Sequence, residues 1–246
     1  MRYAKGNNMP MQAPLIPDPF VPYHCPDNAM AYTVCRGEEE KIRALLEPTY
    51  FEYVDDRYMV EISDFSNCDK VPYMDAAIVL PVRYKDVLGG CYVFECENDD
   101  AAIAAGRDLW GYPKKYAKIT LEAGSRGVVG SVVRRGETLC RIELDLDAPC
   151  ETPSLRLTPH LNTHILPRSD GPGILMSRVI ARDTSPDFET KSSVSCRARV
   201  ELKSTREDPW DALGLVEVLG GGWIVGDFHA TDENGWGRVL DTYMGA

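Results

Sequence analysis

Two long segments of the chain alternate apolar and polar residues with a period of two, and this pattern limits the possible folds more than any other feature. The first segment, residues 139–146, has apolar side chains at Cys140, Ile142, Leu144 and Leu146. The second has apolar side chains at Val194, Cys196, Ala198, Val200 and Leu202. Because successive side chains of a β-strand point to opposite faces, both segments are predicted to be strands with one buried and one polar face.

Further strand patterns cover much of the chain. They occupy residues 31–35, 58–62, 76–84, 91–96 and 128–133, and the last of these is predicted to form a hairpin with residues 139–146 around Arg135-Gly136. Helical patterns are confined to residues 38–47 and 99–109. Many short strands and few helices predict a mixed α+β, β-rich fold, either a β-barrel or a sandwich, with a few packed helices.

The first 22 residues differ in composition from the rest. They contain five prolines and no apolar period: Pro10, Pro14, Pro17, Pro19 and Pro22. Residues 1–22 are therefore predicted to form an extended, proline-rich N-terminal arm. A chain of 246 residues is long enough to bury a large core, and residues 23–246 are predicted to form a single domain.

The charge of the chain bears on its partners and location. A formal net charge of −11 disfavours binding to nucleic acid and to anionic lipid surfaces. No segment has the length and apolar character of a membrane span, and the first residues lack the pattern of a secretory signal. The protein is therefore expected to be cytoplasmic, with no nucleic-acid or membrane partner.

The eight cysteines show neither a CxxC pair nor a Cys/His spacing that suits zinc. They are expected to be reduced and mostly buried, as is usual for a cytoplasmic protein. No metal site is predicted.

The segment from Gly106 to Lys115, with the sequence GRDLWGYPKK, is the most informative for chemistry. A lysine amine is a nucleophile only when it is neutral, so a catalytic Lys114 would need a lowered pKa. Burial in an apolar pocket and the adjacent positive charge of Lys115 would both lower it. If residues 114–121 are extended, only one of the two lysines can face a given cavity. Alternatively, the two lysines are an ordinary solvated surface pair.

This segment, together with three others in the same order, resembles the acetoacetate decarboxylase-like superfamily. The others are LPVRY at 80–84, LNTHILP at 161–167 and VEVLGGGW at 216–223, followed by GDF at 226–228. The resemblance covers residues 30–245. It implies a β-barrel with a buried cavity and a homo-oligomeric assembly. It also implies that Lys114 forms a Schiff base with a ketone substrate without a cofactor, with Lys115 as the cationic neighbour.

The sequence departs from the decarboxylating members of that superfamily at several pocket positions. A family arginine falls on Asn28 and a family glutamate on Asp75, while a second glutamate is retained as Glu61. Glu95 replaces an apolar residue, and it is either a solvated carboxylate at the rim or an additional acid–base group. Loss of the arginine removes a group that could orient a substrate carboxylate. Three aromatic residues, Trp110, Tyr112 and Trp223, are candidates for the substrate-binding wall.

Three functional hypotheses follow from the sequence. The first is a lyase in which Lys114 condenses a small oxo acid such as pyruvate with an aldehyde, and Glu95 or Asp75 assists loss of water. The second is decarboxylation of acetoacetate or a related β-keto acid. The third is a non-catalytic barrel that binds a ketone or a lipid-like ligand. The small-molecule partners expected under the first hypothesis are an oxo acid and an aldehyde.

Overall fold

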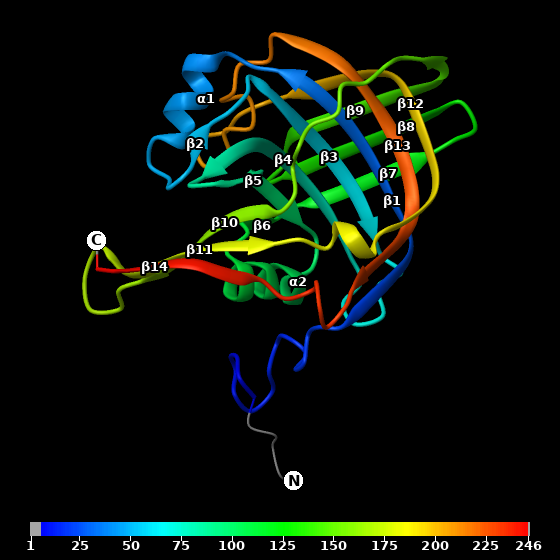
Figure 1. Ribbon diagram of the computed structural model, residues 1–246. Helices are drawn as coiled ribbons and strands as arrows, with labels where there is room; N and C mark the ends of the chain where they lie inside the picture. The colour runs from blue at the N-terminus through cyan, green and yellow to red at the C-terminus, as the bar shows by residue number, and fades with distance from the viewer. Residues whose placement is uncertain (1–5, 246) are drawn as a thin grey trace.

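The computed structural model describes residues 6–245, and most of them lie in one large β-sheet (Figure 1). Its strands are β1 (Tyr23–Arg36), β2 (Glu52–Tyr53), β3 (Arg57–Phe65), β4 (Tyr73–Tyr84), β5 (Val87–Glu97), β6 (Lys114–Tyr116), β7 (Lys118–Ala123), β8 (Gly127–Arg134), β9 (Glu137–Pro149), β10 (His160–Pro167), β11 (Ile174–Arg182), β12 (Glu189–Leu202), β13 (Glu217–Ala230) and β14 (Arg238–Met244). The α-helices in the described part are α1 (Glu39–Leu46) and α2 (Asp100–Ala105). A π-helical turn, Gly106–Trp110, continues α2, and a 3₁₀ turn covers Ser185–Asp187. The β-rich class predicted from the sequence is confirmed.

The order of the strands determines which segments meet at the centre of the molecule. Hydrogen-bonded neighbours follow the path β14-β11-β10-β5-β4-β3-β1-β13-β12-β9-β8-β7, with β2 and β6 attached to β4 and β5. Within the described residues this path has two free ends, so the closed barrel expected from the resemblance is not confirmed. Figure 1 shows the sheet strongly curved, with α1 beside β2 and α2 beside β6.

The hairpin predicted around Arg135-Gly136 is confirmed and joins β8 to β9. Both turn residues have positive φ, 52° for Arg135 and 89° for Gly136. A two-residue hairpin turn of this kind matches the natural twist of the flanking strands. The period-two pattern of β9 is confirmed as well, because Cys140, Ile142 and Leu144 are all buried.

The inner end of the N-terminal arm packs against the domain that follows it. Ile16, Phe20 and Val21 are buried, and the ring of Phe20 lies 5.7 Å from that of Trp110, centroid to centroid. Residues 6–22 contain neither helix nor strand, whereas residues 1–5 of the predicted arm lie outside the described part. These contacts fix the start of β1 beside the π-helical turn.

Cys25 and Cys68 form a disulfide, so the prediction that all eight cysteines are reduced is wrong for this pair. Pairing of β1 with β3 brings the start of one strand near the loop that follows the other, a proximity that the sequence spacing does not reveal. The remaining cysteines are free, and all of them except Cys150 are buried. Among the described residues, no helix has the length and apolar character that a membrane crossing requires.

Candidate active site

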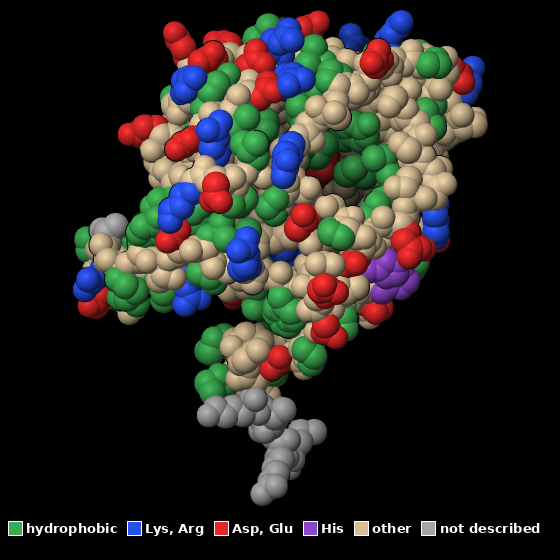
Figure 2. Space-filling model, viewed as in Figure 1, with side chains coloured by type: hydrophobic (Ala, Val, Ile, Leu, Met, Phe, Trp, Pro, Cys, Tyr) green, Lys and Arg blue, Asp and Glu red, His purple; other side chains and the backbone are tan. Residues whose placement is uncertain are grey.

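A cavity of about 390 Å³ lies within the curved sheet. Figure 2 shows a hollow on this face of the molecule, with hydrophobic side chains around it and acidic atoms at its depth. The cavity is lined by seven of the predicted site residues: Asn28, Glu61, Asp75, Glu95, Trp110, Tyr112 and Lys114. Lys115 and Trp223 do not line it, and Trp223 packs against the hydrophobic core instead. The fold therefore brings together residues that are spread over the first half of the chain.

Lys114 reaches the cavity because β6 runs parallel to the end of β5. This pairing places Lys114 opposite Glu95 and Tyr116 opposite Glu97. The Lys114 Nζ donates to Asp75 Oδ2 at 3.0 Å, to Glu95 Oε1 at 2.7 Å and also to Glu97 Oε1. Lys114 is 7 % exposed and all three acids are buried. A single buried ammonium group thus faces three buried carboxyl groups.

Lys115 points away from the cavity, as the alternation of strand residues requires. Its Nζ donates to Asp208 Oδ1 at 2.7 Å and to the carbonyl of Glu207. Asp208 also accepts from Arg134 Nε at 2.9 Å, so its carboxylate is paired with two cations. The expectation that one lysine of the pair faces the cavity is met, but Lys115 does not act there as a cationic neighbour.

The predicted lowering of the Lys114 pKa is wrong in direction. Burial disfavours the charged amine, but the carboxyl groups of Asp75, Glu95 and Glu97 outweigh burial and hold the pKa of Lys114 well above its ordinary value. The prediction rested on Lys115, the neighbour along the chain. The groups that decide the pKa of Lys114 come instead from β4 and β5. Lys114 therefore rests as an ammonium ion.

Two of the acids that contact Lys114, Glu95 and Glu97, have raised pKa values. Burial raises the pKa of Glu97 to about 8, although Lys114 opposes this effect. Burial, again opposed by Lys114, holds the pKa of Glu95 well above its usual range. In such a coupled cluster the protons belong to the group as a whole. Lys114 can become a neutral nucleophile by passing its proton to a carboxylate that it already contacts.

The oxygens of Asp75, Glu95 and Glu97 lie close enough to one another to share a single cation. The Lys114 ammonium hydrogen-bonds to all three side chains and occupies this position. An acidic cluster with an internal cation of its own is suited to proton exchange with that cation.

The helix before Lys114 positions it. Asp99 caps α2 by accepting from the backbone amide of Ala102 at 3.0 Å. The π-helical turn ends at Gly111, which has a φ of 75° that glycine adopts without strain. A Cβ atom at Gly106 would overlap Cδ and Cε of Lys114. The lysine side chain therefore runs across the bare backbone of Gly106.

We expect Gly106→Ala to reduce turnover by about 100-fold, because an added methyl group would displace the amine from its acid partners and misplacement of a reacting group by ~1 Å costs on this order. Turnover and the midpoint of thermal unfolding should be measured together. Gly171→Ala is the matched control, since a Cβ there meets nothing within 4 Å. Equal turnover of the two variants would show that Gly106 does not position Lys114.

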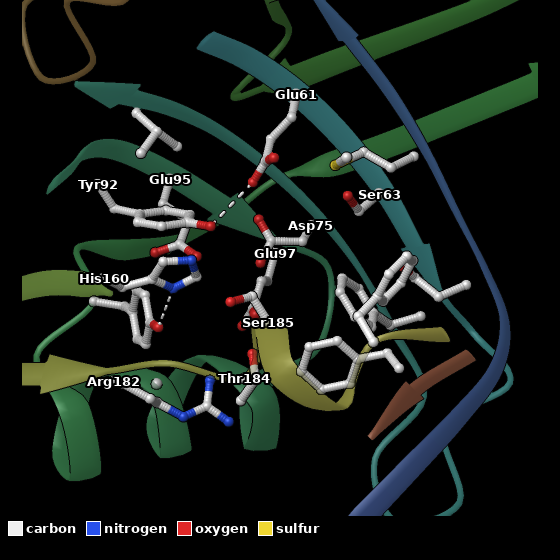
Figure 3. A pocket seen from close by; sticks show the side chains of 18 of the residues that line it. Glu61, Ser63, Asp75, Tyr92, Glu95, Glu97, His160, Arg182, Thr184 and Ser185 are labelled. Atoms are coloured by element: carbon white, nitrogen blue, oxygen red, sulfur yellow. Dashed lines mark hydrogen bonds between the residues drawn. The ribbon is translucent and has the colours of Figure 1, made fainter. Parts of the chain in front are cut away.

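Glu61 lies on the cavity wall and interacts with an aromatic hydroxyl. Its Oε1 accepts from Tyr92 Oη at 3.2 Å, and its side chain points into the cavity (Figure 3). Burial, reinforced by the charge of Asp75, raises the pKa of Glu61 to about 8. Asn28 is also buried, and its Nδ2 donates to the backbone carbonyl of Asp64 at 2.8 Å.

The raised pKa of Glu61 makes stability depend on pH. The folded protein keeps this proton up to about pH 8, whereas the unfolded chain loses it near pH 4.5, so stability from this group is full below pH 4.5 and is lost as pH rises through 8. We expect the unfolding midpoint of Glu61→Gln to rise relative to wild type between pH 5 and pH 8.5. Parallel curves, like those expected for the exposed control Glu217→Gln, would contradict this assignment.

Sequence reasoning missed many of the residues that line the cavity, among them Tyr92, Glu97, His160 and Arg182. Glu97 could have been found, because it shares the strand parity of Glu95. His160 and Arg182 come from β10 and β11, and no local pattern marks them. The Tyr112 hydroxyl lies 2.7 Å from His160 Nδ1, and burial lowers the pKa of His160 to about 3, which keeps it neutral.

A buried lysine on a cavity wall, in contact with acids that can take its proton, defines a class of enzyme that acts on carbonyl compounds through an imine. The sequence matches the acetoacetate decarboxylase (ADC) family over residues 8–243. The chain belongs to this family, and it is a carbon–carbon lyase of the Schiff-base type.

Individual relatives agree with this assignment. The acetoacetate decarboxylase of Burkholderia vietnamiensis is 27 % identical, over 98 % of this chain and 96 % of its own length. A solved acetoacetate decarboxylase superposes with a TM-score of 0.84 and 20 % identity, covering 97 % of this chain and 96 % of its own. The enduracididine biosynthesis enzyme MppR, solved with the condensation product of pyruvate and imidazole 4-carboxaldehyde, superposes with a TM-score of 0.77 at 17 % identity, covering 98 % of each chain.

Proposed function

We propose that this protein condenses pyruvate with an aldehyde through an imine on Lys114 and then expels water. The observation that carries the proposal is the contact of Lys114 with three acids, Asp75, Glu95 and Glu97, of which the last two have raised pKa values. Condensation followed by dehydration needs repeated proton transfer in both directions. A set of acids around one amine is suited to this series of proton transfers.

The first half of the reaction forms the nucleophile. Lys114 passes a proton to a neighbouring carboxylate, and its neutral amine attacks the keto carbon of pyruvate. The keto oxygen leaves as water, which gives an iminium ion. A carboxylate then takes a proton from the methyl group, and the C–H electron pair forms the enamine. All charges in these steps lie within a buried site, where hydrogen-bonded acids act strongly.

The second half joins the reactants and removes water. The enamine carbon attacks the aldehyde carbon, and an acid of the cluster protonates the aldehyde oxygen as the new bond forms. Glu95 then protonates the resulting hydroxyl so that it can leave. Loss of a second proton from the former methyl carbon and departure of the protonated hydroxyl as water create a double bond. Water then hydrolyses the iminium ion, which releases an unsaturated oxo acid and restores Lys114. Overall, one pyruvate and one aldehyde give one product and one water.

The remaining predicted residues form the walls of this site. Nζ of Lys114 lies 5.1 Å from the centre of the Tyr112 ring, so that ring bounds the space beside the amine. Trp110 lies 6.4 Å from Tyr112, centroid to centroid, and extends the same wall. We assign Trp110 and Tyr112 to substrate binding, together with Asn28, which lies on β1. The complex of MppR with a pyruvate–aldehyde product supports such chemistry on this fold.

Decarboxylation of acetoacetate is the second candidate, and the curated relatives named for that activity favour it. In this reaction the iminium ion accepts the electrons of the breaking carbon–carbon bond, and carbon dioxide leaves. Asn28 stands where decarboxylating relatives are expected to have an arginine, so this chain lacks one group that could orient the substrate carboxylate. The third hypothesis, a non-catalytic barrel, does not account for the buried acids that contact Lys114.

Two assays separate the candidates. The protein is incubated with pyruvate and butanal while the absorbance of a conjugated oxo acid is followed, and product mass confirms its identity. In parallel, release of carbon dioxide from acetoacetate is measured. A conjugated product supports the proposal, whereas release of carbon dioxide without condensation would replace it with decarboxylation. A homo-oligomer in the cytoplasm also stays a prediction, and sedimentation would test the assembly.

A further inference from the structure

Arg182, at the end of β11, is a buried cation in the same cavity, and the reaction proposed above does not use it. It is 6 % exposed. Its Nε donates to the carbonyl of Gly235 at 2.8 Å and its Nη2 to the hydroxyl of Tyr23 at 3.0 Å. Its guanidinium carbon lies 4.0 Å from the centre of the Trp110 ring. All of these partners are neutral.

No carboxylate of the described residues forms an ion pair with Arg182. The carboxyl groups of Asp75, Glu95 and Glu97 pair with Lys114 instead, at the other end of the site. A buried charge without an opposite charge is strongly unfavourable. The planar guanidinium group fits a carboxylate through two parallel hydrogen bonds. The groups that face the guanidinium are tyrosine hydroxyls and a backbone carbonyl, so its charge is not compensated by an anion of the described residues.

The two cations of the cavity, Lys114 and Arg182, lie beside different aromatic rings of the same wall. Lys114 Nζ lies 5.1 Å from the centre of the Tyr112 ring, and Arg182 stacks on the adjacent Trp110. Figure 3 shows Glu61 and Asp75 at one end of the cavity, with Arg182 and Thr184 at the other. One end is therefore acidic and holds the nucleophile, and the other is cationic.

We propose that the Arg182 end of the cavity binds a substrate carboxylate that is several carbons away from the carbonyl group attacked by Lys114. This inference rests on the proposed function and specifies its substrate class. The carboxylate of pyruvate cannot fill this role, because it is joined directly to the keto carbon by one bond of about 1.5 Å and stays with Lys114. The carboxylate at Arg182 belongs either to the aldehyde reactant or to a longer oxo acid.

Binding of carboxylates that lack a carbonyl group tests the subsite independently of imine chemistry. Calorimetric titration with pentanoate and with pentanamide should give at least about ten-fold tighter binding of the carboxylate to wild type, the size expected for a charge-assisted contact. Arg182→Gln should abolish this preference, and Arg182→Lys should retain part of it. The control Arg168→Gln, at an exposed ion pair with Asp170, should leave it unchanged.

Two results would overturn the proposal. Equal affinity of wild type for pentanoate and pentanamide would do so whether or not any variant folds. A preference that survives in a folded Arg182→Gln would show that the anion binds elsewhere, with Lys114 the first alternative. In that case Arg182 would serve only to hold Tyr23 and Trp110, and its loss would lower the unfolding midpoint without changing carboxylate affinity.

Borohydride trapping then identifies the reactant that carries the carboxylate. In one arm, 4-oxopentanoate and 4-oxopentanamide compete for Lys114; in the other, 4-oxobutanoate and butanal compete for the enamine formed from pyruvate. If 4-oxopentanoate is preferred in the first arm, the carboxylate at Arg182 belongs to a longer oxo acid. If 4-oxobutanoate is preferred in the second arm, it belongs to the aldehyde reactant. Preference in neither arm would overturn the proposal. Absence of any Lys114 adduct would instead reject the proposed function, while the titration still decides the subsite.

Discussion

Lys114→Arg should lower the rate of condensation by about 10⁴-fold or more while the protein stays folded. An arginine keeps a positive charge in contact with Asp75, Glu95 and Glu97, so the buried acids remain compensated. Its guanidinium group stays protonated in proteins and cannot form the imine. Turnover with pyruvate and butanal measures the loss, and thermal unfolding checks the fold.

Lys115→Arg is the matched control for this loss. Lys115 lies outside the cavity and pairs with Asp208, and an arginine can keep that ion pair. We expect turnover within a few-fold of wild type. A large loss in Lys115→Arg together with an active Lys114→Arg would reverse the assignment of the nucleophile.

Glu95→Gln should lower the overall rate by about 10²- to 10³-fold, because it removes a positioned acid–base group. An amide can still hydrogen-bond to Lys114, so imine trapping with borohydride should persist. The hydroxylated condensation intermediate should therefore accumulate and be detected by mass spectrometry.

Glu143→Gln on β9, a half-buried partner of Arg141 outside the cavity, is the control for Glu95→Gln and should retain full activity. Two other outcomes are informative. A wild-type rate in Glu95→Gln would remove Glu95 from the mechanism. Loss of imine trapping as well would place its role at the first step rather than at dehydration.

Local features of the fold were predictable from the sequence. The alternation in 139–146 and the Arg135-Gly136 turn involve residues that are close along the chain, and both predictions are confirmed. The arrangement of distant strands was not predictable, because the pairing of β1 with β13 and of β11 with β14 depends on non-local hydrogen bonds. For the same reason, the open path of the sheet and the Cys25–Cys68 disulfide have no local signature.

The candidate site was likewise predictable only in its local features. The motif around Lys114 and the replacement of an apolar residue by Glu95 identified groups that the fold does bring together. The direction of the Lys114 pKa could not be predicted, because it depends on the register of β6 against β5 and on Asp75 in β4. Arg182 has no sequence signal either, since its lack of an acidic partner becomes visible only in three dimensions.

The most direct test of this account is to treat the wild-type protein with pyruvate and borohydride and to locate the adduct by peptide mass mapping. A reduced adduct on Lys114, and none on Lys115, is the predicted result. An unmodified Lys114 under conditions in which the protein turns over its substrate would contradict the imine mechanism.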